Sequence, residues 1–220
     1  MATTATRHVR DPWLRFPATW KTYLSLLRDR GERNRPRYTF IHGKLTVVSP
    51  GASHETLKER VGGIIDDLCI ALDVPFLAFG STTFLKSQKP RSGTEPDKSY
   101  YLTRLDLVRG KEQIVMGVDP PPDLVAEIVA THPLGDTLAV YRGFGVREVW
   151  VCRRSEAEFF VLGADGRYAR STASSCLPFL TAEDLTHWAY RQDLPDDKAL
   201  RSQFRAWVVE TLAGRARPPE

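Results

Sequence analysis

Apolar residues in the first fifty positions follow two different periods. Trp20, Tyr23, Leu24 and Leu27 have helical spacing, and this pattern ends before Gly31. This pattern predicts an amphipathic helix with a glycine stop. Two short apolar runs follow at residues 38–41 and 45–48, and the intervening His42-Gly43-Lys44 is typical of the turn of a β-hairpin.

The middle of the chain has the pattern of a helix, three strands, a helix and another strand. We expect Ser53 to cap a helix whose apolar face consists of Leu57, Val61, Ile64, Ile65, Leu68 and Leu72. Extended stretches are predicted at residues 76–84, 99–102 and 124–129, then a short helix at 134–144, a strand at 146–152, and a hairpin in which residues 159–162 turn through Asp165-Gly166. This order predicts an α/β or α+β fold, a sheet with helices on its faces.

The carboxyl-terminal stretch, residues 182–213, is predicted to be helical with a break near Pro195. An apolar stripe runs along it, formed by Leu200, Phe204, Trp207, Val208 and Leu212. Such a stripe packs either on the protein's own core or on a partner. In the second case the chain would form a homodimer, and the sequence leaves both interpretations open.

Composition narrows the class of protein. Of 220 residues, 42% are hydrophobic and 26% are charged, which is typical of a globular chain and argues against disorder, collagen-like repeats and coiled coils. Three cysteines and five histidines are scattered without zinc-ligand spacing. No apolar run approaches the roughly 20 residues that cross a bilayer. We therefore expect a soluble, cytoplasmic protein with no membrane partner.

Positive charge is concentrated near the amino terminus. The net charge is +4, yet residues 1–50 carry ten Lys or Arg against three Asp or Glu, which gives +7 there and −3 over the other 170 residues. A basic segment of this kind either contacts nucleic-acid phosphates or forms a solvated surface.

Candidate chemistry rests on carboxylates in unfavourable places, because no P-loop, GxGxxG, GxSxG or HExxH motif is present. Glu127 interrupts the apolar run 124–129, where an ionised carboxylate costs several kcal/mol unless it is paired or binds a cation. Asp97, in Glu95-Pro96-Asp97, precedes the strand at 99–102. If the two strands are neighbours, Asp97 and Glu127 converge on an oxygen-lined site that suits Mg²⁺ or Mn²⁺. A structural salt bridge is the alternative.

A series of different short motifs runs through residues 17–180. They are Tyr38-Thr39, Gly43-Lys44-Leu45, Ser49-Pro50, His54-Glu55, Gly80-Ser81-Thr82-Thr83-Phe84, Gly93-Thr94-Glu95-Pro96-Asp97, Tyr100-Tyr101, Pro122-Asp123-Leu124-Val125, Glu127-Ile128, Tyr141, Phe144-Gly145-Val146, Glu148 and Trp150. Together they resemble the bacterial family of Uma-type restriction endonucleases, within the PD-(D/E)XK nuclease superfamily. The resemblance implies a restriction-endonuclease-like core, a mixed sheet flanked by helices. We expect a basic segment at 1–16, the nuclease-like domain at 17–180, beginning with a helix and a hairpin, and a helical extension at 181–214.

The resemblance also assigns roles at the site. Asp97 and Glu127 would be the catalytic, metal-binding carboxylates, with the Ile128 carbonyl as a further ligand, Mg²⁺ or Mn²⁺ as cofactor and DNA as substrate. His54 or Glu55, at the helix start, would lie at the rim of the site, and Glu95 would lie close by. Lys98 follows Asp97 directly on a strand, so its side chain should point to the opposite face.

One departure from the family pattern affects catalysis. Val129 stands where the superfamily places a lysine two residues after the Glu, and Thr137 stands at the alternative position, four residues before the Tyr of the next helix. Without that cation, nothing obvious stabilises charge on the attacked phosphate; Lys86 and Arg142 are further substitutes to consider. Two function classes follow: a metal-dependent nuclease, impaired at this position, or an inactive nuclease-like module that binds nucleic acid or protein.

Overall fold

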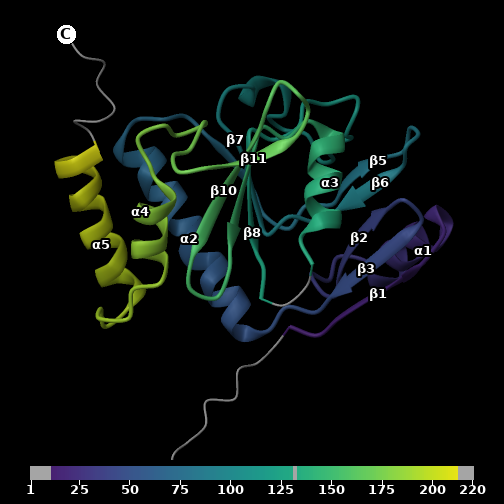
Figure 1. The fold of residues 1–220 in the computed structure, drawn as a ribbon, viewed down its shortest axis with the longest axis horizontal. Coiled ribbons are helices and arrows are strands. Elements are labelled where there is room, and N and C mark those ends of the chain that lie inside the picture. Colours follow the sequence, from purple (N-terminus) through teal and green to yellow (C-terminus); the bar gives the residue numbers. More distant parts are fainter. Residues whose placement is uncertain (1–10, 131–132, 213–220) are drawn as a thin grey trace, which may run out of the picture.

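The computed structural model describes residues 11–130 and 133–212, which form two sheets and the helices around them (Figure 1). The strands are β1 (Trp13–Pro17), β2 (Arg37–Ile41), β3 (Lys44–Val48), β4 (Leu77–Phe79), β5 (Phe84–Lys86), β6 (Ser92–Thr94), β7 (Lys98–Tyr101), β8 (Leu124–Ile128), β9 (Glu148–Cys152), β10 (Ala157–Leu162) and β11 (Tyr168–Ser171). The helices are α1 (Trp20–Arg30), α2 (Ala52–Ala71), α3 (Gly135–Phe144), α4 (Ala182–Ala189) and α5 (Asp197–Trp207), with a short 3-10 helix η1 (Leu105–Leu107) and a π-helical segment η2 (Val208–Leu212).

The central sheet has six strands in the order β11-β10-β9-β8-β7-β4. β4, β7 and β8 are antiparallel neighbours, and β8 runs parallel to β9 with α3 as the crossover between them. A parallel pair requires such a crossover, whereas antiparallel strands need only a turn. The predicted order of helix, three strands, helix and strand therefore matches α2, β4, β7, β8, α3 and β9.

The second sheet has five strands in the order β1-β3-β2-β6-β5. Its β2–β3 hairpin turns through His42 and Gly43, both at positive φ, as a two-residue turn requires. The prediction of one continuous strand over 76–84 is wrong. The chain bends at Ser81, directly after Gly80, so that β4 joins the central sheet and β5 joins the second sheet. Strands β1 and β6 were not predicted from the sequence.

Helix α2 begins earlier than expected. Gly51, with extended φ and ψ of −89° and 177°, is the N-cap residue, and its amide donates to Asp11 Oδ1 at 2.8 Å. The prediction that Ser53 caps this helix is therefore wrong, because the backbone is already helical from Ala52. Ser53 lies exposed in the first turn.

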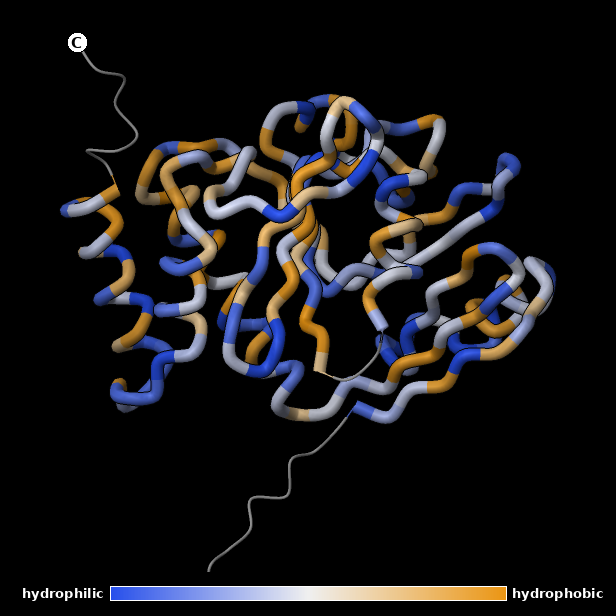
Figure 2. Tube along the Cα trace, viewed as in Figure 1, coloured by the Kyte–Doolittle hydropathy of each residue, from blue (hydrophilic) through white to orange (hydrophobic). Residues whose placement is uncertain are grey.

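Two hydrophobic clusters cover the two faces of the central sheet. Alternate residues of β8 divide between them: Ala126 and Ile128 pack with α2, α4 and α5, whereas Val125 packs with α3. The orange central strands in Figure 2 show this apolar interior. The alternation places Glu127 on the α3 face together with Val125, because successive side chains of a strand point to opposite faces.

The carboxyl-terminal stripe packs on the protein's own core. Leu200 and Phe204 of α5 are buried against the cluster that contains α2, and Trp207 packs on its edge. The break predicted near Pro195 separates α4 from α5. The stripe is therefore not a free surface for a second copy, and self-association stays a prediction without this support.

Glu148, one of the motif residues, holds a loop rather than a reaction site. Its carboxylate is fully buried and accepts hydrogen bonds from the Trp150 indole at 2.6 Å and from the Ser175 and Cys176 amides at 2.8 Å. The carboxylate thereby fixes the segment after β11 against the strand β9 that carries it.

Glu148→Ala should lower the free energy of unfolding by about 3 kcal/mol, because it removes the acceptor of four donors, the Trp150 indole, the Ser175 and Cys176 amides and the Ser175 hydroxyl, at roughly 1–3 kcal/mol for each one that stays dry. Urea unfolding followed by circular dichroism measures the change. Glu156→Ala, at an exposed position in the turn before β10, is the control and should change stability by less than about 0.5 kcal/mol. Equal stabilities of the two variants would contradict this role.

Candidate active site

Asp97 and Glu127 lie at one small cavity. β7 and β8 pair with Lys98 opposite Ala126, which puts Asp97 and Glu127 next to each other at the end of the ladder. The cavity of about 30 Å³ is also lined by Arg37, Thr39, Val48, Pro50, His54, Thr94, Glu95, Ile128 and Thr137. That volume is on the order of one water molecule or one ion. The predicted neighbourhood of the two strands is confirmed.

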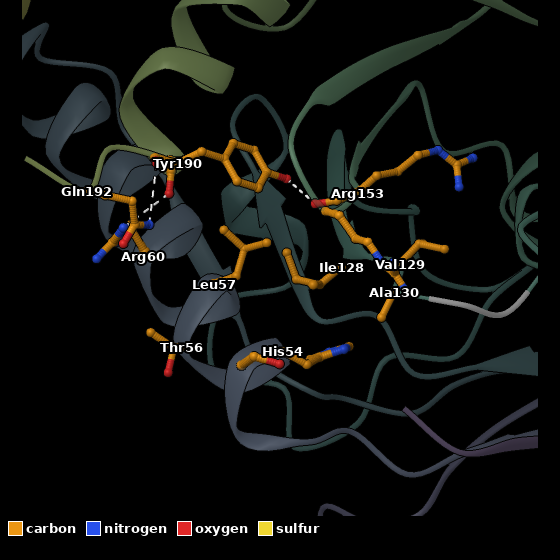
Figure 3. Close-up of a pocket in the computed structure, with 13 residues that line it drawn as sticks. His54, Thr56, Leu57, Arg60, Ile128, Val129, Ala130, Arg153, Tyr190 and Gln192 are labelled. Atoms are coloured by element: carbon orange, nitrogen blue, oxygen red, sulfur yellow. Dashed lines mark hydrogen bonds between the residues drawn. The ribbon is translucent and has the colours of Figure 1, made fainter. Parts of the chain in front are cut away.

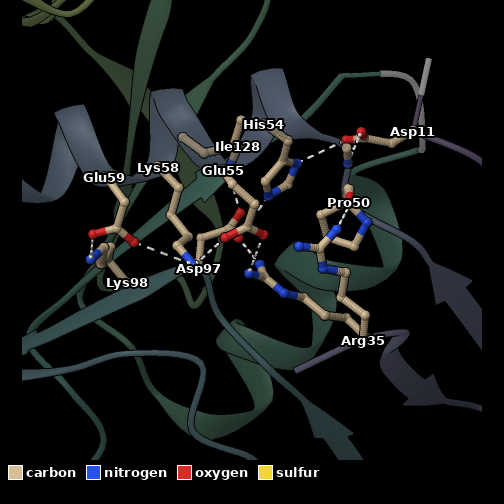
Figure 4. A network of polar contacts seen from close by, with 12 residues as sticks. Asp11, Arg35, Pro50, His54, Glu55, Lys58, Glu59, Asp97, Lys98 and Ile128 are labelled. Carbon is tan, nitrogen blue, oxygen red and sulfur yellow. Dashed lines mark hydrogen bonds and ion pairs between the residues drawn. The ribbon is translucent and has the colours of Figure 1, made fainter. Parts of the chain in front are cut away.

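The Asp97 carboxylate is almost fully buried and makes three charge-assisted contacts (Figure 4). Oδ1 accepts from His54 Nε2 at 2.8 Å and forms an ion pair with Arg37 Nη1. Oδ2 accepts from the Ile128 amide at 2.7 Å. A carboxylate has about four lone-pair directions, so these contacts leave room for one further ligand on Asp97.

His54 is clamped between two carboxylates. It lies in the first turn of α2, where Nδ1 faces Asp11 Oδ2 and Nε2 faces Asp97 Oδ1, each at 2.8 Å. Burial lowers the pKa of His54, and the hydrogen bond to Asp11 opposes that shift. The ring therefore orients Asp97 through Oδ1, the same oxygen that Arg37 contacts, and links it to Asp11, two residues before β1.

Glu127 is buried on the α3 face of the sheet, where the Tyr141 hydroxyl donates a hydrogen bond to Oε1. Burial raises the pKa of Glu127 to about 7, while the hydrogen bond from Tyr141 and the charge of Arg37 act in the opposite direction. Thr137 lies one helical turn before Tyr141, and its side chain is buried at the same cavity. A side chain at position 137 therefore points toward the two carboxylates.

The remaining sequence-predicted residues lie around this centre with partners of their own. Glu95 forms a bidentate ion pair with Arg30, at 2.5 and 2.6 Å, and accepts from the Tyr38 amide at 3.0 Å. Lys98 pairs with Glu59 of α2 at 3.0 Å, on the face of β7 opposite Asp97. Glu55 pairs with Lys58 at 2.6 Å.

The two other cations considered from the sequence do not line the cavity. Lys86 donates to the Gly143 carbonyl at 3.0 Å, and Arg142 is exposed on α3.

Arg37 is the cation that sequence reasoning missed. Its guanidinium side chain is only 8% exposed and lies between Asp97 and Glu55, with Nη2 3.5 Å from Glu55 Oε1. Arg37 and Thr39 are two positions apart on β2, so both side chains lie on the same face of the strand and face the cavity. The available signal was two polar residues, Arg37 and Thr39, that alternate with Tyr38 and Phe40 at the start of the strand. Only the packing of the hairpin against the central sheet shows which site that face meets.

The oxygen atoms at the small cavity suit a hard divalent cation that needs only a few ligands from the protein. Within residues 11–130 and 133–212, no group of three or more His, Cys, Asp or Glu side chains is disposed to hold a metal ion. Of the ligands expected from the sequence, Asp97, Glu127 and Ile128 all line the small cavity. Mg²⁺ is commonly bound by one or two carboxylates, with water and substrate phosphate completing its octahedron, so this set fits.

Comparison with known families decides the relationship. The family model Uma2, described as "Putative restriction endonuclease", matches residues 20–193. The chain belongs to the Uma2 family. The resemblance carried by its short motifs is thereby confirmed. None of the curated proteins is a significant match to the sequence.

One solved structure has a similar fold. The crystal structure of a putative nuclease belonging to DUF820 from Anabaena variabilis is 18% identical in sequence, and the likeness covers 79% of this chain and 99% of that chain with a TM-score of 0.56. At this identity the likeness concerns the fold, and it supports the predicted restriction-endonuclease-like core. No described helix of the Uma2 chain combines the length and apolar character needed to span a bilayer.

Proposed function

We propose that this Uma2 protein hydrolyses phosphodiester bonds in DNA with the help of Mg²⁺ or Mn²⁺ held by Asp97 and Glu127. One observation carries the proposal: carboxylates on two neighbouring strands of a nuclease-like fold line a single cavity the size of an ion. The Ile128 carbonyl would complete the set of protein ligands. A bound divalent cation supplies Lewis-acid stabilisation of the phosphate and a more acidic water.

The chain's own residues orient the carboxylates and supply charge. His54 and the Ile128 amide fix Asp97, and Tyr141 fixes Glu127. Arg37 brings a guanidinium to the same cavity and takes over part of the electrostatic role of the lysine that Thr137 replaces. Because Arg37 is already paired with Asp97, less of its charge is available to a phosphate, and we expect slow cleavage.

Isothermal titration with Mn²⁺ tests the assignment. Asp97→Asn and Glu127→Gln should each weaken Mn²⁺ binding by more than about tenfold, since changes even in the outer shell of metal sites cost 10–100-fold. Cleavage of a plasmid in Mg²⁺ should be lost in both variants. Asp106→Asn, on an exposed turn with a side chain 91% accessible, is the matched control and should behave like the wild type.

A second function is favoured by the contacts of Asp97. His54, Arg37 and the Ile128 amide compensate its charge without any metal, as in a structural ion pair. The alternative is therefore an inactive nuclease-like module that binds nucleic acid or protein. Unchanged Mn²⁺ binding in both carboxylate variants, together with no cleavage by the wild type, would establish this alternative and refute the nuclease proposal.

A further inference from the structure

A second, larger cavity opens beside the candidate active site. It has a volume of about 610 Å³ and lies between the first half of α2, the end of β8 and the end of α4 (Figure 3). His54 and Ile128 line both cavities. A molecule bound in the larger cavity would therefore contact His54, whose Nε2 is hydrogen-bonded to Asp97.

The walls of this cavity suit a flat, largely apolar group. Leu57 comes from α2, Ile128 and Ala130 from the end of β8, and Tyr190 from the end of α4. The Tyr190 hydroxyl donates to the carbonyls of Arg153 and Glu156, the latter at 3.1 Å, so the ring is held in place. Pockets of roughly 300–1,000 Å³ with apolar and aromatic walls bind ligands the size of a nucleotide.

The charge of the lining favours an anion. Three arginines and no Asp or Glu line the cavity. Arg60 is held by Asp197 at 2.9 Å, and Arg153 by Glu158 at 3.0 Å. Arg154 is exposed and forms no ion pair or hydrogen bond within the described part of the chain, so its charge is available to a ligand.

We propose that this cavity receives one unpaired nucleotide of a DNA strand, with its base against Leu57, Ile128 and Tyr190 and a phosphate at Arg154. A base inside a duplex cannot enter such a pocket without leaving its stack, whereas a single strand presents its bases without that cost. The substrate class is therefore single-stranded DNA, or a single-stranded segment of a larger molecule. This inference rests on the proposed nuclease function, because it names the strand that would be delivered to Asp97 and Glu127.

Fluorescence anisotropy with a labelled single-stranded dodecamer, in EDTA, tests the cavity without metal or cleavage. The wild type should bind the single strand at least tenfold more tightly than a duplex of equal length. Arg154→Ala should weaken binding about tenfold through loss of a phosphate contact. Thr56→Trp, which fills the cavity from an exposed position on α2, should weaken binding at least as much.

Two controls match these changes. Arg167→Ala removes the same charge from the exposed turn between β10 and β11, and Ile70→Trp places the same ring at the far, exposed end of α2. Both should bind like the wild type, and thermal melting checks that every variant folds. Equal affinity for duplex and single strand, or wild-type binding by both cavity variants, would overturn the inference. Failure of the Mn²⁺ titration with single-strand binding intact would instead remove the proposed chemistry and leave the cavity assignment standing.

Discussion

Thr137→Lys should accelerate Mg²⁺-dependent DNA cleavage by about 10²–10³-fold, the usual effect of one electrostatic donor in a transition-state site. The side chain at position 137 faces the cavity that Asp97 and Glu127 line, one turn from Tyr141. An ammonium group there would face a carboxylate, which compensates its burial, and would also reach a phosphate at the mouth of the cavity. Single-turnover cleavage of a labelled substrate measures the chemical step directly.

A neutral variant distinguishes the effect of the lysine's length from the effect of its charge. Thr137→Met introduces a side chain of comparable length without charge, so it should cleave no faster than the wild type. If Thr137→Lys is no faster than Thr137→Met, charge at this position is not what limits the reaction. The proposed impairment would then be wrong, even if both variants fold normally.

Arg37→Met should have the largest effect on stability, and it should also lower the residual activity. Removing one partner of a buried ion pair costs about 3–5 kcal/mol, because the other charge stays buried without compensation. Asp97 would keep His54 and the Ile128 amide but lose its permanent cation. Cleavage should fall by roughly 10²–10³-fold if this guanidinium acts in place of the missing lysine. Urea unfolding and single-turnover cleavage measure the two effects.

Three companion variants separate charge from packing. Arg35→Met, at an exposed neighbour that donates to the Pro50 carbonyl at 3.0 Å, should cost less than about 1 kcal/mol. Arg37→Lys should recover part of both losses. Adding Asp97→Asn to Arg37→Met should restore stability, since the stranded charge is gone, and the double-mutant cycle gives the coupling energy. A change below about 0.5 kcal/mol in the free energy of unfolding of Arg37→Met would show that the ion pair does not stabilise the fold.

The sequence alone determined the order of the central elements and the two carboxylates that meet there. The helical and alternating spacings of apolar residues reflect local backbone geometry, which depends little on the rest of the fold. Glu127 stood out because a charge inside an apolar run is costly. The sequence motifs also indicated the Uma2 family, which the family model confirms. Where local signals were weak, as at Gly80 and Ser53, the predicted boundaries failed.

Only the tertiary structure decided what surrounds those carboxylates. Arg37, His54 and Tyr141 come from β2, α2 and α3, and they meet at Asp97 and Glu127 because the hairpin and both helices pack at the same end of the central sheet. The stripe on α5 could face a partner or a core, and its burial against α2 selected the core. Such contacts join residues far apart in the chain, and their energies depend on burial and distance, which no spacing along the sequence encodes.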